Sequence, residues 1–129
     1  MAHSLGSGDY SADVEMDCTI YVDVADPGSA LSLLSGALNV GSESRGVLVY
    51  AGVRVYGAHN DYEMMGAQND FTQWATVLEC EPFGGSLRNE VVAAIAEMLQ
   101  AIWMSGHRAV AACRFEDQLP EGGGLRLYP

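Results

Sequence analysis

The sequence contains no lysine and carries little positive charge of any kind. Its six basic residues are all arginines, and 17 acidic residues give a formal net charge of -11. A chain with this charge is repelled by nucleic acid and by anionic membranes, so neither is expected as a partner. The acidic surface instead suits a basic protein partner, although acidity also serves solubility.

Cysteines and long apolar runs are scarce as well. Cys18, Cys80 and Cys113 form an odd set without a CxxC pair, and all three fall in segments with strand character. We therefore expect free, buried thiols in a reducing cytoplasm rather than a disulfide framework. No apolar run approaches the ~18 residues of a membrane span, and the first residues lack the basic and apolar regions of a signal peptide.

The length and composition indicate one compact domain. The chain has 129 residues, of which 49% are hydrophobic, which is enough for a core without disulfides or metals. Residues 1–13 are small and polar and are expected to form a flexible leader. Residues 14–119 are expected to form a single α+β domain, followed by an irregular tail at 120–129.

The periodicity of apolar residues predicts the secondary structure. Alternation with a period of two predicts strands at 15–24, 46–57, 71–81 and 108–115. Asp26-Pro27 and Ser86 are expected to begin two helices. Asn39 and Gly41 are candidate ends of the first helix, and Gly106 would end the second. The apolar stripes of these helices comprise Ala30, Leu31, Leu34, Ala37 and Leu38 in the first, and Val91, Ala94, Ile95, Met98, Leu99 and Ile102 in the second.

The order of these elements is strand, helix, strand, strand, helix, strand. Right-handed crossovers convert this order most simply into a two-layer βαββαβ ferredoxin-like sandwich. The prediction is therefore a four-stranded antiparallel sheet with two helices on one face.

The densest polar cluster lies between the second and third predicted strands, and its members are His59, Asp61, Glu63, Asn69 and Asp70. Histidine and carboxylates on a loop are able to bind a metal or act as a general base. Their spacing here matches no defined motif, and the alternative is a solvated hairpin loop or a protein-contact surface. We therefore predict no catalytic residue, no metal ligand and no cofactor.

Several aromatic residues are predicted on the sheet face that points away from the helices. This set comprises Tyr21, Tyr50, Arg54 and Tyr56, together with Leu48. Tyrosine and arginine are enriched at the energetic centres of protein interfaces. An isolated exposed tyrosine is ordinary, but several together favour an interface.

The run DFTQWATVLECEP, the capped helix after it and the run ACRFEDQLP fall within residues 70–120. This segment resembles small uncharacterised acidic bacterial α/β proteins, some of which are immunity proteins that accompany secreted toxins. The resemblance implies a fold and a role. It carries no defined site residues with it.

Two hypotheses for the function follow. The first is a non-enzymatic acidic protein-binding domain, such as an immunity or inhibitor protein for a basic toxin. Its predicted contact residues are Tyr50, Tyr56, Asp61, Tyr62, Glu63 and Asp70.

The alternative hypothesis is a ferredoxin-like homodimer that binds a small molecule or a metal and has enzymatic activity. In that case His59, His107 and the nearby carboxylates would carry the chemistry, in a pocket lined by tyrosines and Trp74.

Overall fold

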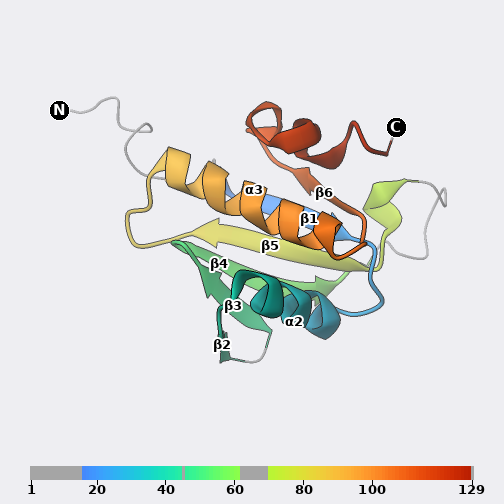
Figure 1. Ribbon diagram of the computed structural model, residues 1–129, viewed down its shortest axis with the longest axis horizontal. Coiled ribbons are helices and arrows are strands. Elements are labelled where there is room, and N and C mark those ends of the chain that lie inside the picture. Colours follow the sequence, from blue (N-terminus) through green and yellow to red (C-terminus); the bar gives the residue numbers. More distant parts are fainter. Residues whose placement is uncertain (1–15, 45, 62–69, 129) are drawn as a thin grey trace.

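The computed structural model describes residues 16–44, 46–61 and 70–128. Within these ranges the chain folds into two α-helices and a six-stranded antiparallel sheet (Figure 1). The strands are β1 (Cys18–Val22), β2 (Ser42–Ser44), β3 (Val47–Tyr50), β4 (Val53–His59), β5 (Thr76–Pro82) and β6 (Ala109–Ala112). The helices are α2 (Pro27–Leu38) and α3 (Arg88–Met104), and short 3-10 turns are η2 (Phe71–Gln73), η3 (Glu116–Gln118) and η4 (Pro120–Gly124). The predicted leader, 1–13, lies outside the described residues.

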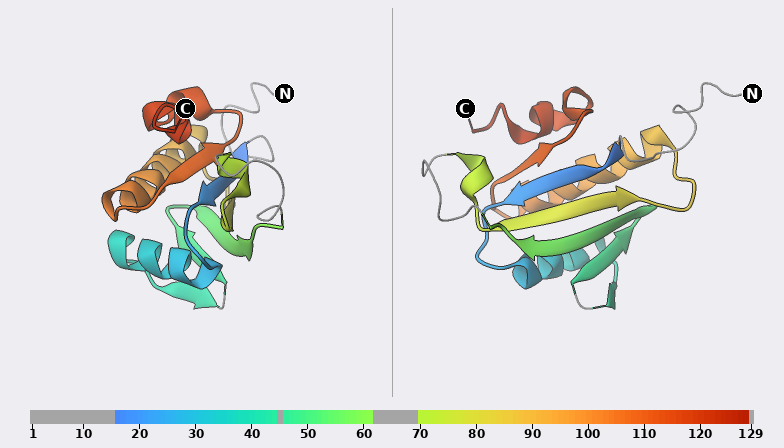
Figure 2. Two further views of the ribbon diagram at one scale, coloured as in Figure 1. Left: turned by 90° about the vertical axis from the view of Figure 1, so that its right-hand side faces the viewer. Right: turned by 180° about the vertical axis from the view of Figure 1, so that it is seen from behind.

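The two helices lie side by side on the same face of the sheet, as the edge-on view in Figure 2 shows. The strand order is β2-β3-β4-β5-β1-β6, and every neighbouring pair is antiparallel. The predicted α+β class is confirmed. The opposite face of the sheet, turned away from α2 and α3, is called the outer face below.

The prediction of four strands is wrong, because residues 46–57 do not form one strand. The chain turns back at Ala51 and Gly52, whose φ angles of 50° and 83° are both left-handed. Two positive φ angles in succession suit the tight turn of an antiparallel hairpin. Tyr50 and Val53 thereby become opposite partners in β3 and β4, and β2 adds a further strand beyond β3.

Helix α2 begins and ends as predicted. The Asp26 carboxylate accepts a 2.8 Å hydrogen bond from the backbone N–H of Ser29, which satisfies one of the first amides of the helix. Asn39 ends the helix in the left-handed conformation, with φ 60°. Gly57 of β4 lies directly under Leu31, where an added Cβ would be only 3.0 Å from a Leu31 methyl carbon, so the missing side chain lets α2 approach the sheet.

Helix α3 buries all six residues of its predicted apolar stripe. Its first turn differs from the prediction, because Ser86 does not cap the helix. The Ser86 hydroxyl bonds to the carbonyl oxygens of Gly52 and Phe83, at 2.9 and 2.6 Å. The Glu90 carboxylate accepts instead from the backbone N–H of Leu87, at 3.0 Å. Ser86 therefore joins the β3–β4 turn to the segment before α3.

The core lies between the helices and the sheet. Its fully buried side chains include Ile20, Leu34, Leu48, Leu78 and Ile95. Residues 120–124 pack against β6 and α3, and Gly123 and Gly124 are buried there. Neither described helix combines the length and the apolar character that crossing a membrane requires.

Candidate functional site

The outer face is built from alternate residues of β4, β5 and β1. Strand registers place Tyr56 opposite Glu79, and Glu79 opposite Thr19, so the three form one row across the sheet. A second row contains Ala58, Val77 and Tyr21. The tyrosines and Val77 are half-buried and Glu79 is exposed. Apolar rings therefore alternate with a carboxylate on a surface that faces away from both helices.

Glu79 is held in place on this face. Its carboxylate accepts a 2.6 Å hydrogen bond from the hydroxyl of Thr19 in the neighbouring strand. Glu81, two residues along β5, is also exposed and lies opposite Arg54 of β4. The Arg54 guanidinium stacks over the Phe83 ring, 4.7 Å from its centroid. Two glutamates thus project from one strand of the outer face.

A depression of about 280 Å³ lies on the outer face where β4 ends. The residues that line it are Thr19, Tyr21, Ala58, His59, Asn60, Asp61, Val77 and Glu79. Asp61 and His59 are exposed, whereas Asn60 is buried. The depression therefore combines an apolar floor from the strands with a polar rim where the chain leaves β4.

Asn60 fixes the two ends of the β4–β5 connection. Its side-chain amide donates to the carbonyl oxygens of Thr72 and Trp74, at 2.7 and 2.6 Å, and its backbone N–H donates to Ala75 at 2.7 Å. A buried amide with these partners satisfies carbonyls that would otherwise lack them. From the sequence alone, Asn60 is only one of several turn-forming residues in this connection, because nothing in the spacing shows which carbonyls it reaches.

Asp70 caps the turn η2 at the far end of this connection. Its carboxylate accepts a 2.9 Å hydrogen bond from the backbone N–H of Thr72. That bond, with a second one from the Thr72 side chain, holds the pKa of Asp70 below its ordinary value of 3.8. Asp70 is exposed and therefore keeps its negative charge at neutral pH.

A chain of aromatic rings borders the outer face on the β1 side. Tyr21 meets Phe71 edge to face with ring centroids 5.3 Å apart, Phe71 meets Trp74 at 6.3 Å, and Trp74 meets Tyr128 at 5.5 Å. The Arg108 guanidinium lies 4.8 Å from the Trp74 ring and bonds to Asp23 at 2.6 Å. The edge-to-face contact with Phe71 orients Tyr21 on the face, and the remaining contacts hold Phe71 and Trp74 in the same cluster.

The structure places the predicted contact residues in different surroundings. Tyr56 lies on the outer face, as predicted, and Asp61 lies on the rim of the depression. Tyr62 and Glu63 lie outside the described residues. The prediction that Tyr50 and Leu48 share this face is wrong, because the turn at Ala51 and Gly52 reverses the alternation. Leu48 is fully buried, and the hydroxyl of Tyr50 bonds to Glu97 of α3.

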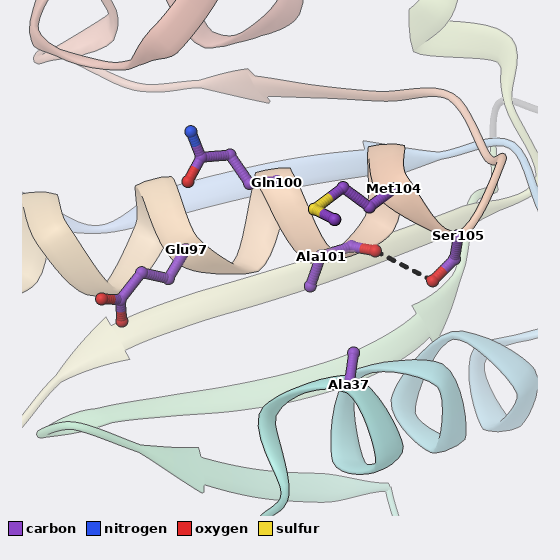
Figure 3. Close-up of a pocket in the computed structure, with 6 residues that line it drawn as sticks. All are labelled: Ala37, Glu97, Gln100, Ala101, Met104 and Ser105. Atoms are coloured by element: carbon purple, nitrogen blue, oxygen red, sulfur yellow. Dashed lines mark hydrogen bonds between the residues drawn. The ribbon is translucent and has the colours of Figure 1, made fainter.

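A second hollow, of about 340 Å³, lies between the two helices on the other side of the molecule (Figure 3). Ala37 of α2 faces Ala101 across it, and Glu97, Gln100, Met104 and Ser105 complete the lining. Small side chains leave this space open, and Met104 is 88% exposed beside it. The Ser105 hydroxyl is occupied by a 2.9 Å bond to the Ala101 carbonyl. Glu97, a second fixed polar group of the lining, is likewise engaged, by the hydroxyl of Tyr50.

The fold brings two sequence candidates for metal or acid–base chemistry together at the depression and separates both of them from a third. His59 and Asp61 lie at the end of β4, whereas His107 follows α3. Across residues 16–44, 46–61 and 70–128, no three histidine, cysteine or acidic side chains are grouped so that they could hold a metal ion.

Comparison of the chain with protein-family models, with curated proteins and with solved structures found no match.

Proposed function

We propose that this chain is a non-enzymatic protein-binding domain that receives a basic protein on its outer face, in the manner of an immunity or inhibitor protein. The observation that carries the proposal is the row of Tyr56, Glu79 and Thr19, in which a half-buried ring adjoins an exposed carboxylate. Tyrosine contributes large contact area at a small entropic cost, and it is enriched among the residues that dominate binding energy.

The charge of the chain supports the same conclusion. A net charge of -11 attracts a basic protein over long distance, and Glu79, Glu81 and Asp61 concentrate negative charge at the outer face. Complementary charge raises association rates from about 10⁵–10⁶ to as much as 10⁸–10⁹ M⁻¹s⁻¹ at low salt. Carboxylates would guide the encounter, and the tyrosines would slow dissociation.

We further assign the fold to the ferredoxin-like βαββαβ sandwiches. The order β6-β1-β5-β4 supports this assignment. It is the spatial order expected of the four strands of that layout when β4 is counted as the second of the four along the chain. On this view β2 and β3 form an added hairpin between α2 and β4. The hairpin extends the sheet on the side away from the aromatic rings.

A second candidate function is supported by the depression at the end of β4. An apolar floor with a histidine, an amide and a carboxylate on its rim also suits a small polar molecule. On this hypothesis two copies of the chain would pack through their outer faces and enclose the site, and the enclosed site would carry an enzymatic activity. A second copy of the chain and a basic partner would both bind the outer face. Variants of that face therefore distinguish the two hypotheses.

The test is capture of binding partners by the tagged full chain from lysate of its own source, followed by mass spectrometry. We expect one stoichiometric basic protein, which Tyr56→Ala retains about 30-fold less well because a central tyrosine contributes about 2 kcal/mol or more. Tyr50→Phe, on the helix side, is the matched control and should capture normally. Equal capture by Tyr56→Ala would refute the outer face as the binding surface.

Light scattering on the purified chain tests the second candidate. A monomer at micromolar concentration supports the protein-binding proposal. A stable dimer that Tyr56→Ala dissociates would instead support the homodimer hypothesis, with the outer face as the dimer interface.

A further inference from the structure

The three cysteines lie close together on the helix side of the sheet. Cys18 of β1 is directly opposite Cys80 of β5. The register of β1 with β6 ends at Thr19 and Ala112, and Cys113, the first residue after β6, shares a side-chain hydrogen bond with Cys18. Cys18 therefore has two cysteine neighbours, one in the adjacent strand and one directly after β6.

Both cysteine neighbours of Cys18 are within reach of a covalent bond. Opposite residues of antiparallel strands have Cα atoms about 4.5–5.5 Å apart. A disulfide requires a Cα separation of about 4.4–6.8 Å, which Cys18 and Cys80 meet as opposite residues. The Cys113 sulfur is already in hydrogen-bond contact with the Cys18 thiol, so chemistry rather than distance decides which bridge forms.

Exposure and hydrogen bonding single out Cys113. It is half-buried, whereas Cys18 and Cys80 are buried. The Cys113 sulfur accepts hydrogen bonds from the Cys18 thiol and from the backbone N–H of Phe115, and these lower its pKa against the opposing effects of burial and the Glu116 carboxylate. Burial raises the pKa of Cys80, and the bond to Cys113 together with burial raises that of Cys18. Since the thiolate is the nucleophile, Cys113 reacts first.

We propose that Cys113 is a site of oxidation by hydroperoxides and that Cys18 resolves the oxidised form into a Cys18–Cys113 disulfide. The Cys113 thiolate attacks the terminal peroxide oxygen and the O–O bond breaks. A sulfenic acid forms, and the other oxygen leaves as hydroxide from hydrogen peroxide or as alkoxide from an organic hydroperoxide. The Cys18 sulfur then attacks the sulfenic sulfur, the S–O bond breaks, and water leaves with the thiol proton. Two thiols are oxidised by two electrons, and the peroxide is reduced.

The chain is well suited to a direct test. Trypsin cleaves after arginine here, and the three cysteines fall in separate tryptic segments, 1–45, 55–88 and 109–114. The reduced full chain is treated with hydrogen peroxide, its remaining thiols are blocked, and it is digested without reductant. We expect segment 1–45 bound to segment 109–114, two of the three thiols lost, and full recovery of the thiols with dithiothreitol.

Variants assign the two roles. Cys80→Ala is the matched control and should still lose both remaining thiols at the wild-type rate. Cys113→Ser should slow thiol loss at least tenfold, and Cys18→Ser should leave a sulfenic acid at Cys113 that dimedone traps.

A bridge between segments 1–45 and 55–88 would overturn the proposal, and so would loss of thiols from Cys113→Ser at the wild-type rate. The mapping on the wild-type chain decides the matter even if Cys18→Ser does not fold.

Discussion

The hydroxyl of Tyr50 donates a 2.6 Å hydrogen bond to the carboxylate of Glu97, and this bond joins the end of β3 to the middle of α3. The contact exists because the turn at Ala51 and Gly52 puts Tyr50 on the helix side of the sheet. It replaces the exposed position that simple alternation predicts for this residue, and it removes Tyr50 from the candidate binding surface.

Removing the Tyr50 hydroxyl should weaken the fold modestly. We expect Tyr50→Phe to lower the free energy of unfolding by about 1 kcal/mol at neutral pH, the usual contribution of one such bond. Urea unfolding measures this change. Tyr56→Phe removes a hydroxyl from the outer face and should change stability by less than about 0.5 kcal/mol. Equal losses from the two variants would argue against the Tyr50–Glu97 bond.

The same bond predicts a pH dependence at the alkaline end. The hydrogen bond to Glu97, with some burial, raises the pKa of Tyr50 above its ordinary value of 10.0. A group whose pKa is raised by folding stabilises the fold below its unfolded pKa and loses that contribution as the pH passes its folded pKa. The stability difference between wild type and Tyr50→Phe should therefore be constant up to about pH 10 and shrink above it. A difference that grows above that pH would contradict the assignment.

The hairpin turn predicts a steric effect at Gly52. A Cβ at this position would collide with the Ser86 hydroxyl, and the φ of 83° is unfavourable for any L side chain. We expect Gly52→Ala to cost about 1–2 kcal/mol for the backbone and about 1–3 kcal/mol more for the collision. Gly84→Ala is the matched control, because Gly84 also has a left-handed φ, of 66°, but nothing lies within 4 Å of its Cβ position. Similar losses of stability in the two variants would show that the collision is relieved.

The side-chain hydrogen bonds of Asn60 should stabilise the turn at the end of the β4–β5 connection. Asn60→Ala leaves the carbonyl oxygens of Thr72 and Trp74 without their partner, at a cost of about 1–3 kcal/mol for each buried group. Hydrogen exchange should accelerate at Trp74, whose backbone N–H bonds to Phe71 in η2, and much less in α3. Unchanged exchange at Trp74 would show that other contacts hold this turn.

The parts of the fold that the sequence predicts are those with local signals. All six apolar residues of α3 were predicted as its buried stripe, and Asp26 with Pro27 marks the start of α2 through chemistry confined to one turn. The β3–β4 hairpin was missed because Ala51 and Gly52 sit inside a continuous β-rich run. Ala51 is not a residue that usually accepts a positive φ, and here the pairing of β3 with β4 stabilises it. The serine-rich β2 has no hydrophobic alternation to reveal it.

The candidate site was only partly predictable, for a related reason. Tyr56 and Asp61 were identified from residue type and position along the chain. The grouping of Thr19 and Glu79 beside them depends on the registers of β1 and β4 with β5, and the β1–β5 register joins positions 60 residues apart. Register is set by long-range packing, so a single sequence does not disclose which polar residues become neighbours.

The measurement that tests the central claim most directly is the association rate constant with the captured basic partner, determined at low and at moderate salt. The variant Glu79→Gln/Glu81→Gln removes charge from the outer face. The variant Asp117→Asn/Glu121→Gln removes equal charge from exposed positions after β6 and is the control. We expect the first to slow association about tenfold at low salt, with the difference reduced as salt rises, and the second to change it less than about twofold. Equal slowing by both variants, or none by either, would contradict recognition through the outer face.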